Sequence, residues 1–66
     1  MRLYLIEVDN FDNEVNKVAY NTLEDIIEDM KINIDREISC YIYDELLQRI
    51  LVEYNGEITD PLDLLI

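Results

Sequence analysis

The residues of this chain best suited to chemistry are carboxylates that recur three and four positions apart. Glu24, Asp25, Glu28 and Asp29 lie at the spacing of one face of an α-helix. Paired carboxyls serve as acid and base in glycoside hydrolysis, but 66 residues leave little room for a sugar cleft. Such a face also attracts a basic partner. We expect these carboxylates to bind a protein partner, and an ordinary solvated face is the alternative.

A second group of carboxylates lies near the amino terminus. Asp9, Asp12 and Glu14 fall in a stretch of Asp and Asn residues, whose short side chains bond to their own backbone in turns, so we expect a hairpin loop. The stretch fails the calcium-binding EF-hand pattern, because Phe11 occupies a ligand position and no glycine permits the sharp turn. We expect no metal there and assign these three carboxylates to the partner-binding set as well.

This chain lacks the residues that most kinds of enzyme catalysis require. The absence of histidine removes the commonest general base and transition-metal ligand, and a single glycine is too few for the phosphate-binding loop patterns. Cys40, the one cysteine, alternates with Ile38 and Ile42, which predicts a buried and unreactive thiol. We therefore expect no enzyme activity, no cofactor and no metal.

The balance of charge and hydrophobicity indicates a folded acidic domain that spans residues 1–66. The chain has 16 Asp and Glu against 5 Lys and Arg, a net charge of -11 at pH 7, yet half of its residues (50%) are hydrophobic. Disordered acidic tails lack that apolar content. With an expected radius of gyration of about 11 Å, the surface approaches the charge density of duplex DNA. Such a surface repels nucleic acid and attracts a basic protein surface.

The composition also favours a cytoplasmic protein. One cysteine excludes an intramolecular disulfide, whereas small secreted domains usually contain several disulfides. The apolar run at residues 3–6 stops at Glu7 and is too short for a signal sequence or a membrane span. We expect no membrane association.

Strand and helix patterns alternate along the chain. Apolar, aromatic and β-branched residues predict strands at 2–8, 15–20 and 38–43. Between them, helical spacing predicts an amphipathic helix over 22–33, capped by Asn21 or Thr22. Its apolar face consists of Leu23, Ile26, Ile27, Met30 and Ile34.

The segment 44–54 fits two interpretations. Its apolar residues lie at helical spacing, Asp44 can cap a helix, and Asn55-Gly56 can end one, so we favour a helix there. Residues 49–54 also have strand composition, which would leave Leu46 and Leu47 in a tight turn. The tail from Asp60 onward begins like a short helix or a final strand, and residues 57–59 can add strand before it.

These patterns predict an α+β fold: a small antiparallel sheet of three or four strands, one acidic amphipathic helix packed on it, and a second helix. The function we favour is that of a small acidic inhibitor that binds a basic, nucleic-acid-binding or catalytic surface of a partner protein. Such polyanion mimics include phage counter-defence proteins and antitoxins of nucleases. The alternative is an assembly module that binds through an apolar and tyrosine patch, as a homodimer for example. That patch consists of Leu62, Leu64, Leu65 and Ile66, or of exposed tyrosines among Tyr4, Tyr20, Tyr41, Tyr43 and Tyr54.

Overall fold

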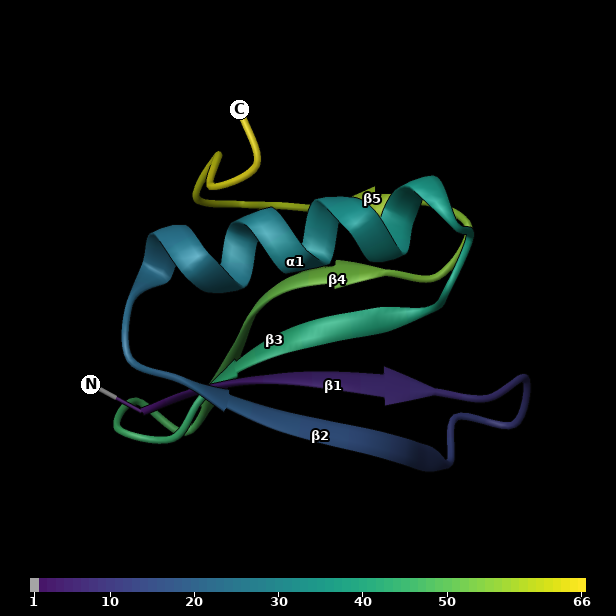
Figure 1. Cartoon of the computed structure of the whole chain (residues 1–66), viewed down its shortest axis with the longest axis horizontal. Helices are drawn as coiled ribbons and strands as arrows, with labels where there is room; N and C mark the ends of the chain where they lie inside the picture. The colour runs from purple at the N-terminus through teal and green to yellow at the C-terminus, as the bar shows by residue number, and fades with distance from the viewer. Residues whose placement is uncertain (1) are drawn as a thin grey trace.

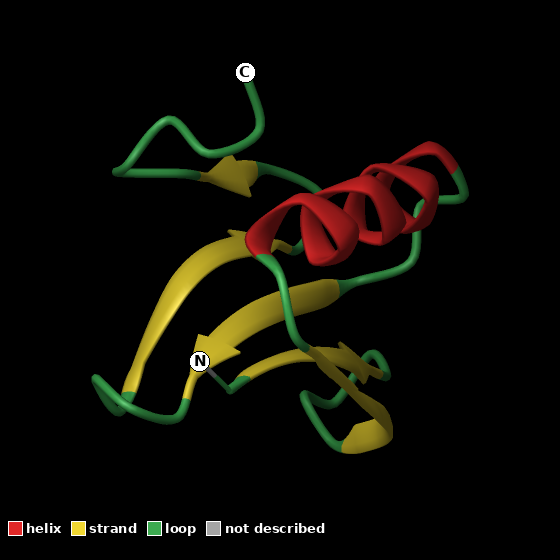
Figure 2. Ribbon diagram, turned by 60° about the vertical axis from the view of Figure 1, so that its left-hand side comes forward, coloured by secondary structure: helices red, strands yellow, loops and turns green. Residues whose placement is uncertain are grey.

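A five-stranded antiparallel sheet carries one α-helix on one of its faces (Figures 1 and 2). The computed structural model describes residues 2–66. The strand order is β2-β1-β3-β4-β5, so β2 and β5 form the two edges. The strands are β1 (Leu3–Val8), β2 (Glu14–Tyr20), β3 (Cys40–Asp44), β4 (Arg49–Tyr54) and β5 (Ile58–Thr59), and the helix is α1 (Leu23–Asp35). The predicted α+β class is confirmed, but the sheet has five strands instead of the three or four expected, because residues 49–54 and 58–59 add β4 and β5.

Strand β1 lies between β2 and β3 and pairs with both. Leu5 lies opposite Val18 on one side and Ile42 on the other, so one row of side chains crosses three strands beneath the helix. The radius of gyration is 10.7 Å, close to the expected value of about 11 Å. The predicted strands at 2–8, 15–20 and 38–43 correspond to β1, β2 and β3 with small shifts at their ends.

Helix α1 has a defined start and a defined stop. Thr22 is the N-cap, and its hydroxyl oxygen accepts a hydrogen bond from the Asp25 amide at 3.2 Å. At the other end Glu37 adopts a left-handed backbone with φ 58, while the Ile38 amide donates to the Asn33 carbonyl at 2.9 Å. This terminal geometry is usually supplied by glycine. The residue that follows the helix, Glu37, therefore adopts a backbone conformation that is unfavourable for a residue with a side chain.

The core lies between the helix and the sheet. Ile26 and Met30 of α1 are fully buried, as the amphipathic pattern predicted. They pack against apolar residues on the helix-facing side of the sheet, which are Leu3, Leu5, Cys40, Ile42, Leu51 and Val52. Burial of Cys40 is confirmed.

The second helix predicted within 44–54 is wrong. Residues 44–54 instead form the end of β3, a turn and β4. The turn holds because the Asp44 carboxylate accepts hydrogen bonds from the Leu46 and Leu47 amides, at 2.9 and 3.3 Å, and Gln48 takes a left-handed φ of 51. Asp44 thus makes an Asx-turn, and Gln48 occupies the left-handed position that Gly or Asn usually takes. Both leucines are exposed.

The carboxyl-terminal tail also differs from the short-helix prediction. Residues 58–59 form β5, and the residues after them make two consecutive turns rather than a helix. Asp60 therefore caps no helix; its carboxylate instead accepts hydrogen bonds from the Leu64 and Leu65 amides at 2.8 and 2.9 Å, which stabilise the turns. Those two leucines pack against the core. Strand formation ends before Pro61.

Candidate functional site

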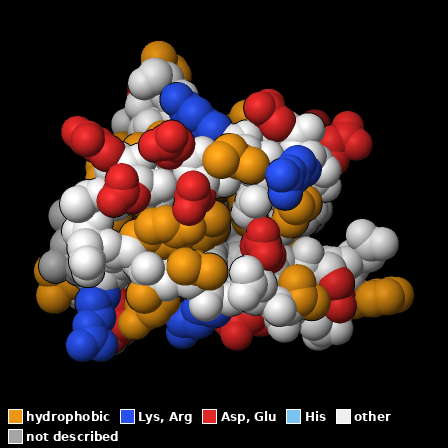
Figure 3. Space-filling model, in the orientation of Figure 1, with side chains coloured by type: hydrophobic (Ala, Val, Ile, Leu, Met, Phe, Trp, Pro, Cys, Tyr) orange, Lys and Arg blue, Asp and Glu red, His pale blue; other side chains and the backbone are white. Residues whose placement is uncertain are grey.

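The solvent side of α1 presents the acidic face that the sequence predicted. Glu24, Asp25 and Glu28 are all exposed. The helix carries five carboxylates and one lysine, and its last turn contains no basic residue. Figure 3 shows acidic side chains gathered over α1 on the visible face of the molecule. These three carboxylates therefore form a continuous negative surface.

Asp29, the fourth predicted carboxylate of this helix, has a different environment. It is half-buried and accepts a hydrogen bond from the Tyr20 hydroxyl at 2.5 Å. Burial and the neighbouring Asp29 carboxylate raise the pKa of Tyr20 to about 12. Asp29 thus joins the helix to the end of β2, and its charge lies at the helix–sheet boundary.

The predicted acidic loop is built around Asp9. Its carboxylate accepts hydrogen bonds from the Phe11 and Asn13 amides, at 2.8 and 2.9 Å, and these bonds lower the pKa of Asp9. Asp12 has a left-handed backbone with φ 62, and Glu14 begins β2. The hairpin loop is confirmed, with Asp9 stabilising it.

The fold separates these two acidic groups. Helix α1 begins beside the end of β2, whereas the loop lies at the opposite end of the β1–β2 hairpin. Figure 1 shows the loop on the side where α1 ends, away from the start of the helix. A single flat contact centred on the start of α1 therefore excludes Asp9, Asp12 and Glu14.

Few of the carboxylates in residues 2–66 lie close to a cation of the same residues. In residues 2–66 the one ion pair within 4.0 Å joins Arg2 to Glu45 at 3.8 Å, and both side chains are substantially exposed. Such a pair contributes little to stability. The carboxylates of α1 have no cation at this distance in that part of the chain.

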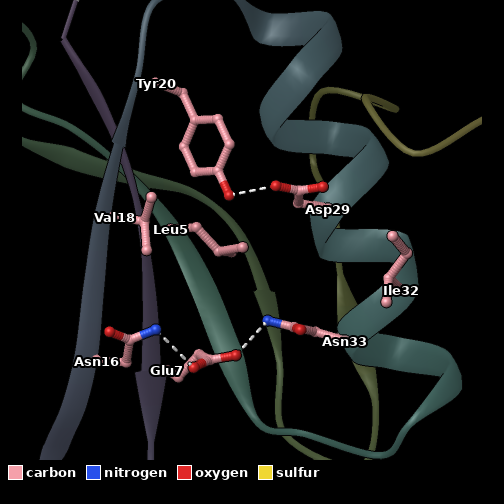
Figure 4. A pocket seen from close by; sticks show the side chains of 8 residues that line it. All are labelled: Leu5, Glu7, Asn16, Val18, Tyr20, Asp29, Ile32 and Asn33. Atoms are coloured by element: carbon pink, nitrogen blue, oxygen red, sulfur yellow. Dashed lines mark hydrogen bonds between the residues drawn. The ribbon is translucent and has the colours of Figure 1, made fainter.

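A groove between α1 and the edge strand β2 is a feature that the sequence did not reveal. Its volume is about 140 Å³, and Figure 4 shows its lining: Leu5, Glu7, Asn16, Val18, Tyr20, Asp29, Ile32 and Asn33. Glu7 crosses its floor and accepts hydrogen bonds from the side-chain amides of Asn16 and Asn33, at 2.9 and 2.8 Å. The sequence held one sign of this groove. Glu7 follows Leu3 and Leu5 at every second position of β1, so a carboxylate occupies a position of the helix-facing side where an apolar residue is expected.

No helix of residues 2–66 covers the other face of the sheet. Tyr4 pairs with Tyr43, and Ile6 with Tyr41, so the three tyrosines share this open face. They are half-buried and shield Ile6, which is 4% exposed. The Lys17 ammonium lies 4.4 Å from the centre of the Tyr4 ring.

Further apolar side chains project from the turns and the tail. They are Phe11, Leu46, Leu47, Leu62 and Ile66. Leu62 and Ile66 belong to the predicted apolar patch, but Leu64 and Leu65 pack against the core. The structure therefore divides that patch and leaves the tyrosines of the open sheet face as the other predicted apolar surface.

The remaining predicted chemistry can be placed on this framework. Cys40 is 1% exposed, and burial raises the pKa of its thiol. Residues 2–66 contain no cluster of three or more potential metal-ligating His, Cys, Asp or Glu side chains. In the same part of the chain, no helix has the length and apolar character needed to cross a membrane.

No known family model, curated protein or solved structure matches the chain.

Proposed function

We propose that this chain is a small cytoplasmic inhibitor that binds a basic surface of a partner protein, as a polyanion mimic and without catalysis of its own. The observation that carries the proposal is the uncompensated face of Glu24, Asp25 and Glu28 on α1. Because a field of one sign accelerates association with the opposite sign, such a face favours fast docking on a basic surface.

The geometry of α1 supports mimicry of a nucleic-acid backbone. At about 1.5 Å per residue its 13 residues extend over about 20 Å. One strand of duplex DNA presents about six phosphates over that length, and α1 carries four exposed carboxylates besides the half-buried Asp29. A surface that binds phosphates with Lys and Arg therefore finds a similar linear density of negative charge. Occupation of that surface would exclude the nucleic acid and inhibit the partner competitively. Phage counter-defence and nuclease neutralisation are roles of this kind.

The test is capture of partners from a nuclease-treated bacterial lysate on the immobilised protein. The informative variant is Glu24→Gln with Glu28→Gln, because both side chains are exposed and their mutual i, i+4 repulsion disappears, so the fold is retained. Glu53→Gln with Glu57→Gln removes the same charge from exposed positions in and after β4 and is the matched control. Asp29 is left intact because it bonds to Tyr20.

We expect a nucleic-acid-handling protein that is captured at about 50 mM NaCl, is released at about 500 mM, and is lost from the helix variant but retained by the control. The protein should also compete with duplex DNA for that partner. Equal capture by wild type and both variants would contradict docking through α1.

The open tyrosine face supports a second candidate, an assembly module. Tyr4, Tyr41 and Tyr43 lie together on a sheet face without a covering helix, and tyrosine is a preferred interface residue. This function predicts binding or dimerisation that is nearly independent of salt. Sedimentation analysis of wild type and of a Tyr41→Arg variant distinguishes it, because only a tyrosine-face dimer dissociates on that substitution.

A further inference from the structure

One side of the edge strand β2 is free of any neighbouring strand in the part of the chain that the structure describes. This strand has seven residues, Glu14–Tyr20, and pairs only with β1. The opposite edge, β5, has two residues. An unpaired edge presents backbone donors and acceptors that another extended chain can complete.

Few of the usual protections cover this edge. Six of the seven residues of β2 are exposed and none is proline. The register shift lies near its beginning, beside Glu7 and Val8, so the stretch from Asn16 to Tyr20 keeps regular pairing. Lys17 is the one charged residue in that stretch, and it reaches over the open face toward Tyr4. The edge is therefore available for pairing.

The groove described above runs along the same edge. Asn16, Val18 and Tyr20 alternate along β2 and line the groove together with α1 (Figure 4). Val18 and Ile32 on its two walls remain 41% and 46% exposed. A strand added to β2 would send every second side chain into this groove, because side chains alternate between the two faces of a sheet.

The groove is apolar at its centre and negative at both ends. Near Asn16 lies the Glu7 carboxylate, and near Tyr20 lies Asp29. Their hydrogen-bond donors are neutral amides and a hydroxyl, so the hydrogen bonds satisfy the oxygens without neutralising the charge. The pKa of Tyr20 is raised partly by Glu7 and Asp25, which indicates a negative field at that end. A complementary occupant carries cations.

We propose that an extended basic segment of the partner adds to β2 as a further strand. Its groove-facing side chains follow the pattern cation, apolar, cation at alternate positions: the central apolar side chain contacts Val18 and Ile32, and the two cations lie against Glu7 and Asp29. Backbone hydrogen bonds to β2 provide the affinity, and the alternate side chains provide the specificity. The inference rests on the proposed function and names the partner segment that it requires.

A second copy of this chain fits the edge poorly. Antiparallel pairing of two β2 strands about their middle residue places Lys17 opposite Lys17, and like charges directly opposite each other are destabilising. Each copy also has a net charge of -11. The charge pattern therefore favours a basic peptide strand over a homodimer at this edge.

The test uses the acetylated and amidated peptide Thr-Lys-Thr-Val-Thr-Lys-Thr and the full protein at low salt. Amide NMR shifts and hydrogen exchange locate the peptide, and a titration gives its affinity. The control peptide is Thr-Lys-Thr-Pro-Pro-Lys-Thr. Its charge is unchanged, but it lacks two adjacent backbone N–H groups, one of which would have to face β2 in a paired strand. On the protein, Val18→Lys blocks the groove, and Ala19→Lys adds the same charge on the other face of β2.

We expect new exchange protection in β2 and none in β5. The Val18→Lys variant should weaken binding about tenfold or more relative to Ala19→Lys, since it puts a like charge against the peptide lysines. Equal affinity of the two variants, equal affinity of the proline peptide, or absence of protection in β2 would overturn strand addition. A wild-type dimer that dissociates in Val18→Lys would overturn it in favour of a second copy.

The same variants separate this inference from the proposed function in the lysate capture. Loss of the partner with the Glu24 and Glu28 double variant but not with Val18→Lys upholds helix docking and overturns strand addition. Loss of the partner with Val18→Lys but not with the double variant upholds strand addition and overturns helix docking.

Discussion

The stability of this protein should rise with salt, because its net charge of -11 is concentrated in a molecule of 28 × 24 × 18 Å. Most proteins lose surface ion pairs as salt is added. Residues 2–66 have one exposed pair to lose, between Arg2 and Glu45, and many repulsions to screen. The perturbation is a change from about 0.15 M to about 1 M NaCl, which shortens the screening length from about 8 Å to about 3 Å.

The magnitude follows from charge and size. On a sphere of roughly 14 Å radius in water, that change lowers the repulsion from about 6 to about 3 kcal/mol. In the unfolded chain, which has a radius of gyration of about 25 Å, the same change in salt lowers the repulsion by only about 1 kcal/mol. The free energy of unfolding should therefore rise by about 2 kcal/mol, which corresponds to a melting temperature about 10 °C higher.

Circular dichroism melts at the two salt concentrations provide the assay. The control is the same pair of melts near the isoelectric point of about 4.1, where the net charge that salt screens is small. A melting temperature that is independent of salt at neutral pH would refute the reasoning. An equal increase at both pH values would also refute it, since it would reflect general exclusion of salt from the protein surface.

Three further predictions concern single residues. Tyr20 should be the tyrosine with the highest pKa, about 12 by NMR titration, and Asp29→Asn should lower it. Because the unfolded tyrosine loses its proton near pH 10 while the folded one keeps it, Tyr20 should reduce stability as pH rises from about 10 to about 12. Cys40 should react slowly with Ellman's reagent in the native protein and rapidly after urea unfolding, since its thiol is 1% exposed. Glu37→Gly should stabilise the protein by about 1 kcal/mol in urea titrations, because it relieves the left-handed backbone, whereas Glu37→Ala should not.

Each of these has a contrary result. An unchanged Tyr20 titration in the Asp29→Asn variant would show that the Asp29 carboxylate has little influence on the hydroxyl. Rapid native labelling of Cys40 would place the thiol at a site that opens readily. An equal gain from alanine and glycine at position 37 would assign the effect to the lost carboxylate rather than to the backbone.

Local patterns in the sequence were sufficient for the elements with a strong period or a clear cap. The spacing of Ile26 and Met30 predicted α1, and Thr22 was one of its two expected caps. Alternation of Cys40 and Ile42 with the tyrosines predicted the two faces of β3. These features depend on near neighbours in the chain, which a sequence contains in full.

The error in segment 44–54 arose where local signals were balanced. Leu46, Leu47, Ile50 and Leu51 satisfy both a helical spacing and a strand composition. Pairing with β3 decided the outcome, and Asp44 made the turn possible by accepting two amides. Gly56 does have the left-handed conformation expected of it, at φ 78, but it turns the chain after β4 instead of ending a helix.

Composition and short-range periodicity were enough to predict the acidic charge, the amphipathic helix, the first three strands and the burial of Cys40. The strand order, which leaves β2 at an edge, and the position of α1, which creates the groove beside it, became visible only in the folded molecule. The fold also separates the loop around Asp9 from the face around Glu28. Such arrangements depend on contacts between distant residues, which compete by packing and hydrogen bonding and leave no period in the sequence.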